Sequence, residues 1–286
     1  MIIMKFGGAV LREPDGFRRM VRIVRDRPAG PTAVVISAFA TATRDLEFAA
    51  RLAQKGLAVE ARERVGQVIS DHRTLVRALL PAASARAGME ALLDEAGLEL
   101  ATILEGVSTT RQLTPRTLDR ILATGEFLAL HIARHVLQED GIDVVSVDAR
   151  SIIVTTSEHG NARPLPEKSA VRVRHDLAPA LAAHEVVLVQ GFVGRTEDGA
   201  TTTMGKESSN LTATLLGALL GATEVVIYTD VEGVRSADPH LCDGTVLRPH
   251  LTYAEARTAA QNGLKLLYPT MIEPAEEAGL RIRIAH

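Results

Sequence analysis

The sequence predicts an α/β fold in which helices cover both faces of a mostly parallel sheet. Strand-like apolar segments alternate with segments of helical spacing along most of the chain. Two of the strand-like segments, 185–191 and 224–230, are apolar on both faces, as strands inside a parallel sheet are. Because ligands bind such sheets at the carboxyl ends of the strands, polar residues that follow a strand are the first candidates for a site.

The first half of the chain begins with two strand–helix units and continues as a helical region. Strands are predicted over 1–6 and 32–37, with a helix over 14–25 between them, and 38–45 is predicted as a loop. Residues 46–139 are rich in Ala, Leu, Glu and Arg, which predicts several helices. Breaks between these helices are expected near Gly56, Pro81, Gly88 and Pro115.

Strands return in the second half. Residues 194–203 place turn residues between two short extended runs and predict a hairpin. A helix is predicted to follow over 208–221. The other predicted strands are 143–148, 151–156, 185–191, 224–230 and 280–285, and the last predicted helices are 253–261 and 270–278.

Composition limits the class of protein. With 286 residues, of which 46% are hydrophobic, the chain can bury a substantial core. The net charge of -3 and the even spread of Lys and Arg give no support to nucleic-acid or membrane-surface binding, so we expect a small-molecule partner. Cys242 is the single cysteine, which excludes an internal disulfide. The sequence shows no signal core and no apolar run of roughly 18 to 20 residues, so a cytoplasmic protein is expected.

The start of the helix at 208–221 is a candidate anion site. Gly205, Lys206, Ser208 and Ser209 stand together there. The first backbone N–H groups of a helix lack intrahelical partners and the helix dipole is positive at this end, which suits a phosphate or a carboxylate.

Lys5 is a second candidate cation, directly before Gly7 and Gly8 at the end of the first strand. A backbone without Cβ atoms can approach a phosphate closely. The alternative is a lysine that simply reaches solvent from a strand end. No Walker A loop and no GxGxxG motif is present, which disfavours P-loop and dinucleotide-binding proteins.

Other polar residues follow predicted strands or interrupt apolar segments. Ser37 and Thr43 follow the second strand, where hydroxyls either contact a ligand or satisfy a turn. Glu126 lies in an apolar helical segment, either on its exposed flank or as the receiver of a substrate ammonium. Asp230 and Asp238 bracket a loop and either form turns or bind a ribose, or Mg²⁺ through water.

Lys265 is a further cation near the chain end. His131 and His135 have the i, i+4 spacing of metal ligands, but no HExxH pattern and no third ligand accompanies them. A helix-surface pair is the favoured interpretation, and no metal-ligating residue is assigned.

Six segments, in order along the chain, resemble the amino acid kinase family and, within it, the catalytic domain of aspartate kinases. They are KFGG, VISA, TGEFL, VQGFVGRTEDGATTTMGKESSNLTA, VVIYTDVEGVRSADP and GLKLLYPTMIEPAEEAGLRIRI. The resemblance implies a three-layer αβα sandwich and an enzyme that uses ATP and Mg²⁺ to convert a substrate carboxylate into an acyl phosphate. It also implies one domain over 1–286, with a substrate lobe (1–184) and a nucleotide lobe (185–286).

The resemblance assigns roles to individual residues. Lys5 matches the lysine that stabilises the transferring phosphoryl group, Glu126 the acid that accepts the substrate ammonium, and Lys206 takes the place of an arginine that binds the α-carboxylate. The other substrate-site residues are Gly7, Gly8, Ser37, Thr43, Phe192, Glu207 and Asn210. The nucleotide-site residues are Thr229, Asp230, Asp238 and Lys265.

The chain departs from the aspartate kinase pattern in the substrate segments. Ala9 and Val10 replace a Thr-Ser pair, and GKESSN replaces GRGGSD. Lys206 keeps the positive charge without the planar fork of arginine, Glu207 adds an acid, and Asn210 replaces one. Three functions stay open: a kinase for aspartate or a close analogue, a kinase for a phosphonate, phosphate or carbamate, and a non-catalytic nucleotide-binding homologue.

Two expectations concern assembly. Aspartate kinases commonly carry regulatory ACT domains after this region, and the sequence stops at His286, so feedback control through such a domain is not expected. The apolar helices of 46–139 either form a homodimer face or pack on the chain's own sheet, since both produce the same pattern.

Overall fold

Six parallel strands form the centre of the molecule. The structure is a computed structural model that describes residues 1–39, 41–237, 242–264 and 266–286. The strand order is β3-β4-β2-β1-β7-β8, and each neighbouring pair is parallel. A separate antiparallel hairpin pairs β5 with β6. The strands are β1 (Ile2–Phe6), β2 (Thr32–Ile36), β3 (Val144–Val147), β4 (Val186–Gln190), β5 (Val193–Arg195), β6 (Thr201–Thr203), β7 (Glu224–Tyr228) and β8 (Arg281–Ala285).

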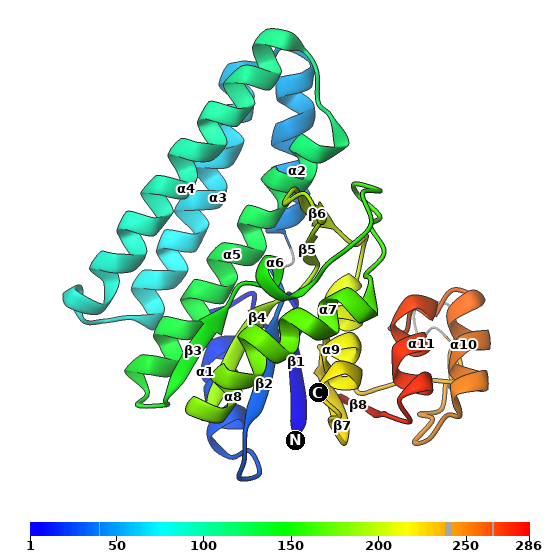
Figure 1. Ribbon diagram of the computed structural model, residues 1–286. Helices are drawn as coiled ribbons and strands as arrows, with labels where there is room; N and C mark the ends of the chain where they lie inside the picture. Colours follow the sequence, from blue (N-terminus) through cyan, green and yellow to red (C-terminus); the bar gives the residue numbers. More distant parts are fainter. Residues whose placement is uncertain (40, 238–241, 265) are drawn as a thin grey trace.

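Helices cover both faces of the sheet, which confirms the predicted three-layer α/β fold. Helix α5 packs on β2, β3 and β4, whereas α9 packs on β1, β2 and β7, and the two lie on opposite sides of the sheet (Figure 1). Helices α3 and α4 form a long hairpin that projects beyond it (Figure 1). The helices are α1 (Pro14–Arg25), α2 (Ala42–Gln54), α3 (Ala58–Leu79), α4 (Ala83–Thr110), α5 (Pro115–Glu139), α6 (Ala149–Ile152), α7 (Pro166–Arg172), the π-helical turn η1 (Val173–Leu177), α8 (Ala178–Ala183), α9 (Ser208–Leu219), α10 (Tyr253–Gln261) and α11 (Pro269–Glu277).

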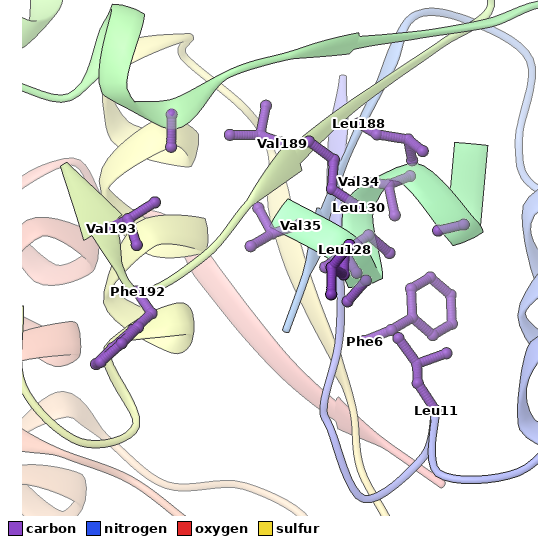
Figure 2. Close-up of a cluster of buried hydrophobic side chains, with 14 of the residues drawn as sticks. Phe6, Leu11, Val34, Val35, Leu128, Leu130, Leu188, Val189, Phe192 and Val193 are labelled. Carbon is purple, nitrogen blue, oxygen red and sulfur yellow. The ribbon is translucent and has the colours of Figure 1, made fainter. Parts of the chain in front are cut away.

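The core joins α5 to the centre of the sheet. Phe6, Val34 and Leu188, from three neighbouring strands, surround Leu128 and Leu130 of α5 in Figure 2. All five are almost completely buried. Since burial of each such side chain contributes roughly 1.5–3 kcal/mol, this packing fixes the strand ends relative to α5. Within the described ranges, no helix is long and apolar enough to cross a membrane.

Most predicted elements are confirmed, and the differences have local causes. Helices end or begin at Gly56, Pro81 and Pro115 as expected, but the break at Gly88 is wrong because α4 continues through it. A glycine inside a helix costs only about 1 kcal/mol relative to alanine, and the buried face of α4 outweighs that cost.

The predicted strand at 151–156 is also wrong. Asp148 caps a short helix there, because its side chain accepts a hydrogen bond from the backbone N–H of Arg150 at 2.9 Å. Only isolated bridges follow, at Val154 and Thr155. The predicted loop at 38–45 is shorter than expected, since α2 begins at Ala42. The helical segment 166–183 lay outside the predicted elements.

Candidate active site

The carboxyl ends of the strands are linked by one row of backbone hydrogen bonds that continues beyond the sheet. The N–H of Gly191 donates to Ile36, that of Ser37 to Phe6, that of Gly7 to Tyr228 and that of Thr229 to Ala285, at 2.8, 3.2, 3.1 and 2.9 Å. Four strands therefore present their next residues side by side. Gly7, Ser37 and Thr229, which the sequence predicts from separate segments, lie along this one edge.

Lys5 is buried at this edge, with only 6% of its surface exposed. The alternative of a solvent-reaching lysine is therefore wrong. Its Nζ lies 3.3 Å from the position that a Cβ on Gly7 would occupy, so a larger residue at Gly7 would crowd the ammonium. Burial lowers the pKa of Lys5 to about 8, against the opposing attraction of Glu207 and Glu126. The structure thus places a desolvated cation between two acids.

Glu126 approaches the same place from α5. It is 4% exposed, and its carboxylate accepts a 2.6 Å hydrogen bond from the backbone N–H of Ala38, just after β2. Burial raises the pKa of Glu126 to about 8, opposed by the Ala38 hydrogen bond and by Lys5. The buried acid of the two alternatives is therefore the correct one, and Glu126 also anchors the loop after β2.

The start of α9 supplies the other side of the site. Lys206 and Glu207 are exposed, and Glu207 has a left-handed φ of 62° as the N-cap residue. The N–H groups of Ser208 and Asn210 donate to Gly205 and Glu207, at 3.4 and 3.1 Å. These two groups are therefore engaged in the turn, and the helix start offers an anion fewer free donors than the sequence predicts.

Two buried polar atoms at the edge lack a partner. They are Ser37 Oγ and Asn210 Oδ1, in side chains that are 8% and 4% exposed. An unpaired buried polar atom costs roughly 1–3 kcal/mol, and such atoms in a native structure call for an explanation. Both residues were predicted to contact substrate, and a polar ligand would satisfy both atoms.

Phe192 follows β4 with a left-handed φ of 71°. Its backbone N–H donates to Thr212 Oγ1 at 3.2 Å, which ties this turn to α9. The ring points away from the core side chains Phe6 and Leu128 (Figure 2). Such a backbone conformation is costly outside glycine and clusters at functional sites.

The remaining predicted residues lie at different positions. Thr43 is in the first turn of α2, half-buried, rather than in a loop. Gly8 is half-buried beside Gly7. Thr229 Oγ1 donates to the exposed Asp230 at 3.2 Å. Asp238 and Lys265 lie outside the described residues.

Sequence reasoning missed three contributors. The Ala38 N–H that holds Glu126 carries no side-chain signal. Gly191 was missed although a glycine at a strand end is a signal: a Cβ there would lie 2.5 Å from the Cβ of Ser209. Asp119, a fully buried acid on α5, stands seven residues before Glu126, a spacing that places both on one helix side.

Other features of the described chain lie elsewhere. Cavities of about 650 Å³ and 860 Å³ adjoin α1, and Glu224 and Tyr228 line the first, so β7 is less enclosed than predicted. We place the site at the carboxyl edge because the buried charges gather there. In the described ranges no three His, Cys, Asp or Glu side chains form a metal-binding group. His135 Nδ1 bonds the carbonyl of His131 at 2.8 Å, within their own helix.

A parallel sheet with a buried lysine after its central strand defines a class of protein that is confirmed by comparison. The family model described as the amino acid kinase family matches residues 1–286. The chain belongs to the amino acid kinase family.

Aspartokinases are among its most similar relatives. Aspartokinase 3, chloroplastic, of Arabidopsis thaliana is 29% identical over 99% of this chain and 50% of its own length. Aspartokinase of Chlamydia trachomatis is 30% identical over 98% of this chain and 60% of its own length. The solved structure of Escherichia coli aspartokinase III in complex with aspartate and ADP matches with a TM-score of 0.89 at 27% identity, covering 100% of this chain and 61% of that one. The chain thus spans about half to three fifths of the length of these relatives.

Proposed function

We propose that the chain catalyses ATP-dependent phosphorylation of the side-chain carboxylate of aspartate or a closely related amino acid. The observation that carries this proposal is the buried Lys5, flanked by Glu126 and Glu207 at the edge where four strands end. A desolvated cation stabilises a transferring phosphoryl group more strongly than an exposed one, because the surrounding dielectric is low. The similarity to aspartokinases supports this choice of reaction.

The acceptor is held by residues of both charges. Glu126, once ionised, receives the substrate ammonium, and Ser37 Oγ and Asn210 Oδ1 gain the partners that they lack. Lys206 is exposed on the opposite side, where it reaches the α-carboxylate. The side-chain carboxylate then points to Lys5. No covalent enzyme intermediate is needed, since positioning and charge stabilisation suffice for phosphoryl transfer.

The nucleotide lies at the end of β7, with Thr229 and Asp230 as its contacts and Asp238 and Lys265 as further ones. We place the acceptor mainly in residues 1–184 and the nucleotide mainly in 185–286. Mg²⁺ is usually held by one or two carboxylates and the phosphates rather than by an all-protein cage, and Asp230, an exposed carboxylate beside Thr229, fits this arrangement. When bound, Mg²⁺ neutralises charge on the phosphates.

An ADP-release assay over a panel of amino acids tests the proposal. We expect turnover with aspartate or a close analogue. Turnover only with a phosphonate, phosphate or carbamate would keep the kinase and change the acceptor, a change that Glu207 and Asn210 in the substrate segment would explain. Tight ATP binding without turnover of any acceptor would make the chain a non-catalytic homologue and overturn the proposal.

A further inference from the structure

Asp119 is a second buried acid on α5, two turns before Glu126. It is completely buried, and its carboxylate accepts hydrogen bonds from His159 Nδ1 at 2.7 Å, from the backbone N–H of Gly160 at 3.1 Å and from Thr203 Oγ1 at 2.5 Å. These donors come from two segments far from α5 in the sequence. Asp119 therefore links α5 to the loop 157–163 and to β6.

Both linked segments lead to the turn that carries Lys206. Thr203 ends β6 three residues before Lys206. The loop is tied to the same strand, because the N–H of Ala162 donates to the carbonyl of Thr203 at 3.0 Å. A Cβ on Gly205 would lie 2.9 Å from Asn161 Oδ1, so the loop also packs directly against the turn.

The cost of the buried charge indicates a role beyond packing. A buried carboxylate is tolerated only when its oxygens are hydrogen-bonded, and apolar side chains of similar volume often stabilise a core as well or better. Buried polar networks that are fully satisfied also fix one geometry, because the loss of any donor leaves a charge unpaired. Asp119 holds three donors in one fixed arrangement.

We infer that Asp119 is a positioning residue that sets the place of Lys206 relative to Glu126. The inference rests on the proposed function. One rigid helix carries both acids: Glu126 faces the acceptor, and Asp119 holds the hairpin and loop that present Lys206 to its other end. A displacement of about 1 Å in a positioning group can cost about 100-fold in rate, so the distance between the two ends is worth fixing.

Replacement of the hydroxyl donor tests the inference without removing the buried charge. In Thr203→Val the shape of the side chain is kept and one donor to Asp119 is lost. We expect the KM for the amino acid to rise about tenfold, as the loss of a hydrogen bond to a charged group does, while the KM for ATP stays within about twofold. Thr203→Ser, which keeps the hydroxyl, is expected to restore most of the affinity.

Thr202→Val is the matched control. Thr202 is equally buried on β6, but its hydroxyl bonds Thr155 at 2.7 Å rather than Asp119. We expect its KM for the amino acid to stay within about twofold of the wild type. Equal losses in the two valine variants, or equal increases in the KM values of ATP and amino acid, would overturn the positioning role.

A double-mutant cycle shows whether the effect passes through Lys206. In a Lys206→Ala background, Thr203→Val should cost little further affinity; full additivity would contradict the inference. If the wild type phosphorylates no acceptor, the proposed function fails, and hydrogen exchange of residues 204–207 decides the structural part. Exchange there should be faster in Thr203→Val than in Thr202→Val, and equal exchange would remove the role of Asp119.

Discussion

Glu126→Gln separates the function of the buried acid from its effect on stability. The substitution keeps the size of the side chain and an oxygen that accepts the Ala38 N–H, but it removes the charge. If Glu126 binds the substrate ammonium, the KM for the amino acid should rise about 10- to 100-fold, because a hydrogen bond to a charged group contributes about 1.5–3 kcal/mol. The KM for ATP should stay within about twofold.

Stability should change in the opposite direction, and the sign follows from the pKa of Glu126. Burial raises this pKa from 4.5 to about 8, so folding takes up a proton between those pH values. The free energy of unfolding of the wild type is therefore highest below pH 4.5 and falls as the pH rises to about 8. At about 1.4 kcal/mol per pH unit, the whole window corresponds to at most about 5 kcal/mol.

Glutamine escapes this loss but accepts the Ala38 hydrogen bond less strongly than a carboxylate does. We therefore expect Glu126→Gln to match the wild type near pH 5 and to exceed it by about 2 kcal/mol at pH 8. Urea unfolding at the two pH values, with Glu139→Gln as an exposed control on the same helix, measures this. A difference that is independent of pH, or a variant that is less stable at pH 8, would refute the reasoning.

The other predictions concern the same edge. Lys5→Met, which keeps the buried volume, should fold and bind ATP but lose about 100- to 1000-fold in kcat, and a wild-type rate in an ADP-release assay would exclude the assigned role. In the wild type kcat should fall above about pH 8, where Lys5 loses its proton, and a flat pH profile to pH 10 would argue against this. Gly191→Ala should cost about 1–3 kcal/mol in thermal or urea unfolding because its Cβ meets Ser209 at 2.5 Å; a combined Ser209→Gly change should recover it, and no recovery would point to another cause. Lys206→Arg should lower the KM for the amino acid by about two- to tenfold through bidentate contact, whereas an unchanged KM would place Lys206 away from the α-carboxylate.

The fold could be predicted because its signals are local. Doubly apolar strands such as 185–191 fix the parallel sheet, and glycine or proline marks most helix ends. The failures arise where a tertiary or side-chain contact outweighs propensity. Helix α4 passes Gly88 because its apolar face is buried, and the Asp148 cap converts the start of a β-like segment into a helix.

The site was predictable in its residue types but not in its environment. Lys5, Ser37 and Glu126 could be found because each stands at a strand end or interrupts an apolar run. Their burial could not be predicted, since it depends on segments distant in the sequence, such as the Ala38 N–H that meets Glu126. The same holds for Asp119, whose partners lie some 40 and 84 residues away.

Chemical trapping of the product tests the central claim most directly. An acyl phosphate reacts with hydroxylamine to give a hydroxamate, whereas a phosphorylated phosphonate, phosphate or carbamate does not give that amino-acid hydroxamate. With aspartate, ATP and Mg²⁺, we expect hydroxamate in proportion to ADP from the wild type and almost none from Lys5→Met. ADP without hydroxamate, or equal hydroxamate from both proteins, would contradict phosphoryl transfer to a carboxylate at Lys5.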